Sequence, residues 1–238
     1  LCVLKRLIAS GAAVLAISRG PIVPFEHEHL RWIIGDLTAS DLHLEDYLVD
    51  AVVHCAPLWH LPPILDLLAD AGVKRIVAFS STSIFAKASS KNHYERDVVE
   101  KLVKAEAALS SQSSEKNIAG WTILRPTMIY GVGLDLNVTS LAKFIKRFKF
   151  FLVYPPAFGR RQPVHADDLA IAVMQSLANT TSFGRAYNVS GGEIVTYREM
   201  LERLFAVYGL KPKIIATTFL PLLLNIAGFI FRRKHING

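Results

Sequence analysis

The sequence predicts an α/β fold in which helices cover both faces of a doubly wound, parallel β-sheet. Short apolar segments recur along the first half of the chain, and segments with helical spacing separate them. Of the 238 residues, 51% are hydrophobic and 20% are charged, which allows a sizeable core. Parallel strands that are buried on both faces form such continuous apolar runs, and right-handed crossovers wind the sheet in both directions.

The predicted elements alternate along the chain. Apolar residues at helical spacing predict a helix from Leu1 that ends near Gly11. Further helices are expected over residues 64–71, which Gly72 follows, and over about residues 95–110. Apolar runs predict buried strands at residues 12–17, 32–34, 51–55, 75–80 and 121–124. An α/β domain that binds no nucleotide fits this alternation equally well, because periodicity does not identify a ligand.

Charge and cysteine content narrow the function classes. The formal net charge is +7, and basic residues gather at 143–149, 160–161 and 232–234. Because no nucleic-acid motif accompanies this charge, we expect solvated faces, a few cations for phosphates, and no nucleic-acid partner. Cys2 and Cys55 lie far apart without metal-ligand spacing. That arrangement predicts buried apolar thiols, no bound metal, and a reducing, cytoplasmic location.

Residues 214–231 form the most membrane-like stretch of the sequence. The stretch is short for a membrane span, and Pro221, Asn225 and Gly228 interrupt it. We therefore expect a packed or interfacial helix there. With the basic residues that follow it, the segment 214–234 is a candidate for peripheral contact with a membrane.

The opening of the sequence departs from that of a doubly wound dinucleotide-binding sheet. Such a sheet begins with a strand and a glycine-rich turn that precede the first helix. Here the helix is under way at Leu1, and neither GxGxxG nor GxxGxxG occurs in the chain. The first strand of these sheets is central, so its absence leaves unpaired backbone on both neighbouring strands. We therefore expect a fragment that binds a dinucleotide poorly.

Four segments in order along the chain together resemble one protein family. They are Val77–Phe85, Leu124–Gly131 with its Arg-Pro and Tyr-Gly pairs, Gln162–Ala170 and Ala186–Gly192. In this order and spacing they resemble the extended short-chain dehydrogenase/reductase family, the NAD-dependent epimerase/dehydratase group. The resemblance implies a Rossmann-type fold that lacks the opening strand and loop. Residues 1–129 would form the NAD(P)-binding domain and 130–238 mostly a substrate lobe, with 160–192 packing back onto the sheet.

The resemblance also implies a binding site for NADP or NAD. Arg19 lies where the adenosine ribose would sit, and its cation could bind the 2′-phosphate of NADP, which favours NADP slightly over NAD. A surface arginine in a loop, with no role in binding, explains this position equally well. Asp36 resembles the family's adenine-contacting aspartate; its alternative is a turn or N-cap residue. The expected cofactor contacts are Arg19, Asp36, Leu37, Cys55, Ala56, Pro57, Ser80 and Pro126.

The catalytic pattern of that family is incomplete in this chain. Its members usually carry Tyr-x-x-x-Lys on the long helix, where the lysine shares a face with the tyrosine and lowers its pKa. Tyr94 is followed four residues later by Val98, and Lys101 lies roughly 10 Å further along a helix axis. Alignment on Lys104–Glu106 instead places Val98 and Leu102 at the two positions.

The remaining candidates are weaker. The catalytic candidates are Tyr94 and Ser81 or Thr82, whose hydroxyl either donates to a substrate or caps the end of the strand. Arg160 and Arg161 are candidates for binding a substrate diphosphate, although exposed surface arginines are the commoner outcome. Asp167 or Asp168 is expected to cap a helix that begins near Leu169.

Three functions follow from these observations. The first is an NAD(P)-dependent oxidoreductase or epimerase-like protein that transfers hydride at a hydroxyl or carbonyl carbon of a nucleotide-sugar or similar small-molecule substrate. The second is a catalytically impaired NAD(P)-binding scaffold or sensor, which the missing Tyr-x-x-x-Lys supports. The third is a membrane-associated steroid- or quinone-type reductase, which rests on residues 214–231 alone. A homodimer is a candidate assembly for each.

Overall fold

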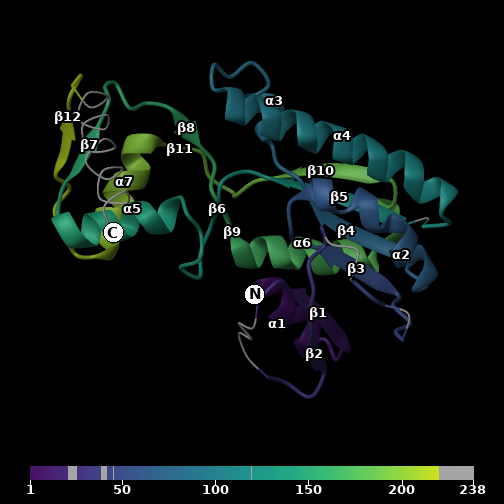
Figure 1. Cartoon of the computed structure of the whole chain (residues 1–238). Helices are drawn as coiled ribbons and strands as arrows, with labels where there is room; N and C mark the ends of the chain where they lie inside the picture. Colours follow the sequence, from purple (N-terminus) through teal and green to yellow (C-terminus); the bar gives the residue numbers. More distant parts are fainter. Residues whose placement is uncertain (21–25, 39–41, 45, 119, 220–238) are drawn as a thin grey trace, which may run out of the picture. The chain divides into compact units, whose positions relative to one another are not determined.

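The computed structural model describes residues 1–20, 26–38, 42–44, 46–118 and 120–219 (Figure 1). The chain forms two compact units. Unit 1 comprises Leu1–Thr127 and Val164–Ser190, and unit 2 comprises Met128–Pro163 and Gly191–Gly238.

Parallel strands form the centre of unit 1, as the apolar runs predict. One sheet pairs β1 (Val14–Ser18) with β2 (Leu30–Ile34), and the other has the order β10-β5-β4-β3. The strands of this second sheet are β3 (Ala51–His54), β4 (Arg75–Phe79), β5 (Gly120–Pro126) and β10 (Arg185–Val189). All pairings in both sheets are parallel. β5 is longer than predicted because Arg125 and Pro126 pair with Asn188 and Val189 of β10, which are distant in sequence.

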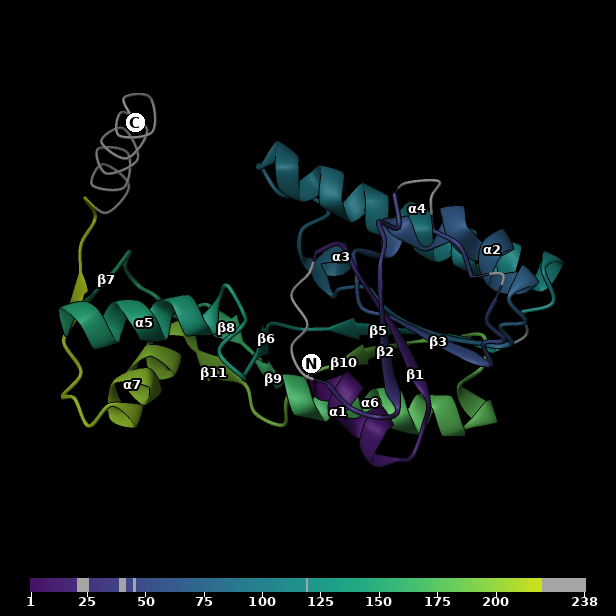
Figure 2. The same ribbon diagram turned by 60° about the horizontal axis from the view of Figure 1, so that its bottom comes forward.

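Helices cover both faces of these strands (Figure 2). α2 (Leu65–Asp70) and α4 (His93–Glu115) lie on one side, and α1 (Cys2–Ala9) and α6 (Ala166–Ala178) lie on the other. Short elements connect them: the 3-10 turns Leu58–His60, Pro62–Ile64 and Thr180–Ser182, and the helix α3 (Ser83–Ala86). α4 begins two residues earlier than predicted because the Asn92 side chain caps it, accepting a hydrogen bond from the Tyr94 amide at 3.0 Å.

The core explains why the strands read as continuous apolar runs. On one face of β4, Ile76 and Ala78 join the larger core cluster with Leu65 and Leu109. On the opposite face, Val77 packs with a second cluster that includes Leu124 and Val173. Successive residues of a strand point to opposite faces, so a strand covered on both sides must be apolar at every position.

Unit 2 is built around two helices and short strands. Its elements are β6 (Ile129–Tyr130), α5 (Val138–Phe148), β7 (Phe151–Val153), β8 (Arg160–Arg161), β11 (Val195–Thr196), α7 (Tyr197–Val207) and β12 (Ile214–Ala216). The short strand β9 (Val164–His165) belongs to unit 1. Ile145 of α5 packs with Leu201 and Phe205 of α7. A capping box between Thr196 and Glu199 begins α7.

The start of the expected C-terminal helix is a strand instead. β12 (Ile214–Ala216) pairs in parallel with β7, and this backbone pairing overrides the apolar pattern that suggested a helix over 214–231. The rest of that segment, and the basic residues up to 234, lie outside the described residues. Among the helices that the structure describes, none has the length and apolar character needed to cross a bilayer.

A buried arginine ties the second sheet of unit 1 to its neighbours. Arg75, at the start of β4, is only 6% exposed, and its guanidinium stacks 4.5 Å from the ring centre of Phe183. It donates to uncharged acceptors in β4, β5, α6 and the 3-10 turn that follows α6, namely Ile76 O at 3.1 Å, Gly120 O, Thr122 Oγ1 at 2.6 Å, Ser176 O at 2.6 Å and Ser182 Oγ at 2.9 Å. Burial lowers the pKa of Arg75 to about 10, so the group is still charged at neutral pH.

An ion pair sets the position of the long helix on the sheet. Arg125 of β5 donates through Nε to the Glu106 carboxylate of α4 at 2.9 and 3.1 Å, and its Nη2 donates to the same carboxylate. The two side chains are 20% and 11% exposed. The bond to Glu106 raises the pKa of Arg125. A paired, partly buried fork of this kind fixes both the distance and the rotation of α4 against β5.

Replacing Arg75 with methionine should destabilise the fold strongly. The variant keeps an apolar stem but leaves several buried acceptors without a donor, each costing about 1–3 kcal/mol. We expect the free energy of unfolding, measured by urea denaturation, to fall by about 3 kcal/mol or more. The matched control, Lys74→Met at the preceding exposed residue, should change it by about 0.5 kcal/mol or less. Equal effects of the two substitutions would contradict this role of Arg75.

Candidate functional site

The carboxyl ends of the parallel strands in unit 1 carry the residues that the sequence suggested for cofactor binding. Arg19 follows β1, Asp36 follows β2, Cys55 follows β3 and Ser80 follows β4, whereas Pro126 ends β5. Ligands of open α/β sheets bind beyond the carboxyl ends of the strands. The expected contacts therefore lie at the edge where this fold class binds ligands.

Asp36 stabilises the turn that follows β2. Its Oδ1 accepts hydrogen bonds from the backbone amide of Thr38 at 2.8 Å and from the Thr38 hydroxyl at 2.7 Å. These bonds lower the pKa of Asp36, and the nearby charges of Arg19 and His60 lower it further. Asp36 is thus a turn residue, one of the two alternatives from the sequence. It is also an ionised carboxylate that lies near two potential cations.

The other residues of this edge differ in accessibility. Arg19 is exposed, whereas Leu37 is half-buried and packs against the larger core cluster. Cys55 is exposed and Cys2 half-buried, so the prediction of two buried thiols is wrong. The strand β3 ends before Cys55, which leaves that side chain outside the sheet.

The turn after β3 is held by a buried histidine. His54 is 4% exposed, and its Nε2 lies 3.2 Å from the carbonyl oxygen of Pro57. Because that oxygen only accepts, Nε2 carries the proton. Burial lowers the pKa of His54, so the ring is neutral at physiological pH. His54 is the one polar residue of the strand β3. A lone polar residue in an apolar strand could have indicated that it holds the following turn, but our sequence analysis did not assign it this role.

The hydroxyls that follow β4 behave differently from one another. Ser81 Oγ accepts a hydrogen bond from the Ser83 amide at 3.1 Å, and Thr82 Oγ1 donates to the Pro126 carbonyl at 3.1 Å. Both therefore close the turn that leads into α3. The Ser80 hydroxyl is buried and has no hydrogen-bond partner among the described residues. Such an orphaned group costs about 1–3 kcal/mol and calls for an explanation.

Neither alignment of the long helix produces a tyrosine–lysine pair. The Tyr94 side chain is 71% exposed at the first turn of α4. Lys101 binds Asp97 at 2.8 Å, and this pairing raises the pKa of Lys101. Val98 and Leu102, the positions of the second alignment, pack into the larger core cluster. Lys91 precedes the first residue of α4 and is exposed.

The start of α6 corrects one expectation. The helix begins at Ala166, and His165 is its N-cap because its Nδ1 accepts from the Asp167 amide at 3.2 Å. Asp167 instead binds Arg6 of α1, with Nε and Oδ1 2.9 Å apart. The predicted aspartate cap is therefore wrong, since this carboxylate bridges two helices. Within the described ranges, no group of three or more His, Cys, Asp or Glu side chains is arranged to hold a metal ion.

In unit 2, the two arginines proposed for a substrate diphosphate lie side by side on β8. Arg160 and Arg161 are both exposed. The Arg161 guanidinium lies 5.7 Å from the ring centre of Tyr197, and its Nη1 donates to the Arg160 carbonyl at 2.8 Å. Burial raises the pKa of Tyr197, so its phenol remains protonated next to this cation at neutral pH.

The chain is similar in sequence and structure to several known proteins. No family model matches the chain. It is 28% identical over 167 residues to chloroplast stem-loop binding protein of 41 kDa b from Arabidopsis thaliana, covering 68% of this chain and 43% of that protein. It is 25% identical over 210 residues to UDP-glucose 4-epimerase from Vibrio cholerae, covering 72% of this chain and 61% of the epimerase. The chain thus spans about half the length of these curated relatives.

A solved structure matches a larger part of the chain. MoeE5 in complex with UDP-glucuronic acid and NAD is similar with a TM-score of 0.74 and 21% sequence identity, covering 91% of this chain and 81% of that chain. At this identity the likeness identifies the fold, in agreement with the parallel sheet and its flanking helices. The chain has a Rossmann-type α/β fold, which it shares with that structure.

Proposed function

We propose that unit 1 binds NAD or NADP at the carboxyl ends of its strands, and that the protein processes a nucleotide-sugar or similar hydroxyl or carbonyl substrate. The observation that carries this proposal is the orphaned Ser80 hydroxyl at the same edge as the ionised Asp36 and the exposed Arg19. The names of the similar proteins support the ligand class, because one is a UDP-glucose 4-epimerase and another was solved with a UDP-sugar and NAD.

Several residues at this edge fit a dinucleotide, whereas the glycine-rich turn that usually holds its pyrophosphate does not occur in the sequence. Asp36 can accept hydrogen bonds from ribose hydroxyls, and the Ser80 hydroxyl is free to donate to or accept from a bound group. Arg19 is exposed, so its charge remains hydrated, and its guanidinium suits the 2′-phosphate of NADP. When bound, the nicotinamide supplies the hydride chemistry. In unit 2, Arg160 and Arg161 are the candidate cations for the diphosphate of the substrate.

A second function, an NAD(P)-binding scaffold or sensor, is favoured by one specific observation. Val98 and Leu102 fill core positions at the place where the family's acid–base pair would stand in one alignment. In the other alignment Tyr94 is solvent-exposed and Lys101 is paired with Asp97. Loss of that pair removes roughly 10²–10⁴ in rate from proton transfer, which leaves binding intact but chemistry slow.

Ser80→Ala should change stability and cofactor affinity in opposite directions. Removing an unsatisfied buried hydroxyl should raise the free energy of unfolding without cofactor by about 1 kcal/mol. Affinity for NAD or NADP, measured by calorimetry, should fall about three- to tenfold because a hydrogen bond to the cofactor is lost. Ser113→Ala is the matched control, since Ser113 is also buried with an unpaired hydroxyl but lies on α4. The idea fails if both variants bind the cofactor as the unmodified protein does.

Arg19→Ala should separate the two cofactors. We expect the variant to lose about tenfold or more in affinity for NADP, because a charge-assisted bond to the 2′-phosphate disappears, and about twofold or less for NAD. Arg31→Ala is the control, since Arg31 is an exposed arginine within β2 rather than after a strand. An equal loss for both cofactors would argue against a 2′-phosphate contact and in favour of NAD.

Hydride transfer distinguishes the enzyme from the scaffold. UDP-glucose or UDP-glucuronic acid would be added to the cofactor-loaded protein, and the nicotinamide absorbance would be followed over a single turnover. We expect slow reduction or oxidation of the bound cofactor, about 10²–10⁴ slower than in a relative with the complete tyrosine–lysine pair. A cofactor that binds but stays spectrally unchanged with both sugar nucleotides would instead support the scaffold.

A further inference from the structure

One segment of unit 2 combines strong positive charge with exposed aromatic rings. From Leu136 to Ala166 the sequence contains no Asp or Glu and six Lys or Arg residues. Four of the six cations lie within or directly after α5, at Lys143, Lys146, Arg147 and Lys149. The cofactor proposal above does not use α5, so an inference about it stands independently of that proposal.

The side chains of α5 are sorted into three rows along the helix. Leu141 and Ile145 pack toward α7 and form the buried row. Phe144 and Phe148 form a second row one turn apart and are 38% and 52% exposed. Residues four apart share one face of a helix, which is why each row is continuous.

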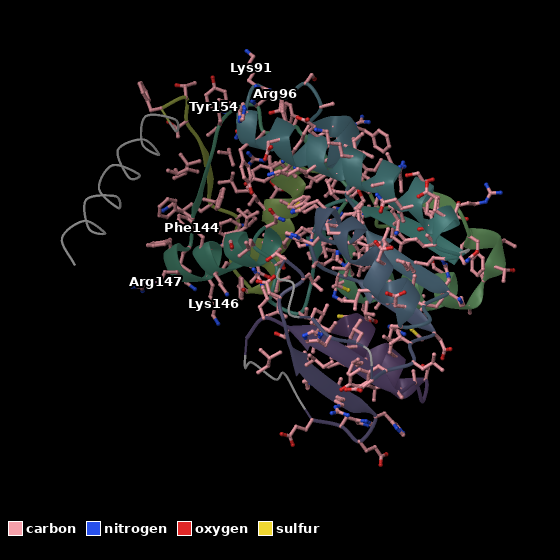
Figure 3. All side chains as sticks on the ribbon, turned by 45° about the vertical axis from the view of Figure 1, so that its right-hand side comes forward. Lys91, Arg96, Phe144, Lys146, Arg147 and Tyr154 are labelled. Carbon is pink, nitrogen blue, oxygen red and sulfur yellow. The ribbon has the colours of Figure 1, made fainter. Side chains whose placement is uncertain are left out.

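The third row is basic. Lys143 and Arg147 are exposed and also lie one turn apart, beside the aromatic row. Figure 3 shows Phe144, Lys146 and Arg147 projecting outward from α5. Lys146 is turned toward α7, where its Nζ lies 5.9 Å from the ring centre of Tyr208. The basic–aromatic face is therefore defined by Lys143, Phe144, Arg147 and Phe148.

The exposed rings are part of a packed aromatic cluster. The ring centre of Phe144 lies 4.6 Å from that of Phe148, 5.4 Å from that of Phe151 and 6.1 Å from that of Phe150. The last two contacts are edge-to-face. Such packing holds the rings in place, so that no ordering of loose side chains is needed when they meet an apolar surface.

We propose that the basic–aromatic face binds the surface of an anionic lipid bilayer. An amphipathic helix with phenylalanines on one side and Lys or Arg beside them lies in the plane of a membrane interface, with the rings at the acyl boundary and the cations at the headgroups. Anionic headgroups attract each nearby cation, and the segment holds no carboxylate that would oppose this attraction. The contact proposed for α5 is peripheral, because a helix of 11 residues is too short to cross a bilayer.

The ring geometry favours lipid over nucleic acid. Proteins that bind single-stranded nucleic acid stack bases on the open faces of aromatic rings. Here Phe144 contacts three other phenylalanine rings, which leaves less of its surface open to stack a base. A bilayer requires only apolar area beside positive charge and needs no open ring face.

The test measures sedimentation of the full chain with vesicles made of one part phosphatidylglycerol to two parts phosphatidylcholine. We expect binding that weakens with salt and is much weaker for phosphatidylcholine alone. Lys143→Glu/Arg147→Glu should weaken the association about thirtyfold or more, because each lost cation removes about fivefold and each new carboxylate adds repulsion. Phe144→Ser/Phe148→Ser should weaken it about tenfold or more, because the apolar contact is lost.

One control repeats the charge change of the first variant at other exposed residues, and another removes an exposed apolar side chain outside the basic–aromatic face. Lys5→Glu/Lys104→Glu alters net charge equally at exposed residues of unit 1, and Val207→Ser removes an exposed apolar side chain of α7. Both should bind as the unmodified protein does. The charge-reversal pair concerns exposed side chains, so it remains informative if the phenylalanine variant unfolds. The proposal is overturned if the unmodified chain does not bind the vesicles or if the face variants bind them as the controls do. It is also overturned if the basic–aromatic face binds a stem-loop RNA and not the vesicles.

Discussion

The buried guanidinium of Arg75 is the constraint on which the second sheet of unit 1 depends. A charge in this position survives only because five uncharged acceptors and one aromatic ring replace the water it loses. These acceptors belong to β4, β5, α6 and the turn after α6, so the same group that needs them also fixes their mutual positions. The amino-terminal end of β4 is therefore rigid, and the carboxyl end of the strand, where Ser80 lies, is held in a defined place.

The carboxyl end of the sheet carries the residues that we propose for cofactor binding. At the amino-terminal end Arg75 donates five hydrogen bonds, although its Nε has no partner among the described residues, whereas at the carboxyl end the Ser80 hydroxyl is unpaired and Arg19 is exposed. Asp36 and His54 stabilise the local turns without covering this edge. Proteins tolerate unsatisfied or strained groups chiefly where a ligand completes them. The unpaired Ser80 hydroxyl, at the edge where this fold class binds ligands, is the physical basis of the cofactor proposal.

The long helix α4 packs apolar residues into the core at the positions where one alignment would place an acid–base pair. Its rotation is set by the ion pair between Glu106 and Arg125, which leaves Val98 and Leu102 facing the core. With apolar residues there, α4 stabilises the sheet but brings no proton-transfer pair toward the strand ends. The same helix thus supports the binding edge while explaining why slow chemistry or none is expected. α5, in unit 2, is amphipathic in another way, because its aromatic and basic rows both remain accessible.

The sequence by itself determined the parallel sheet, because strands buried on both faces, such as Arg75–Phe79, must be almost continuously apolar. It also located the strand-end candidates, since residues that follow parallel strands gather at one edge. Tertiary structure alone decided the partners of polar groups. His165 caps α6, and the carboxylate of Asp167 pairs with Arg6, which lies on another helix. Likewise, β12 replaces the first three residues of a predicted helix because β7 offers them backbone partners. Local pattern carries no information about such distant neighbours, and their hydrogen bonds outweigh local preference.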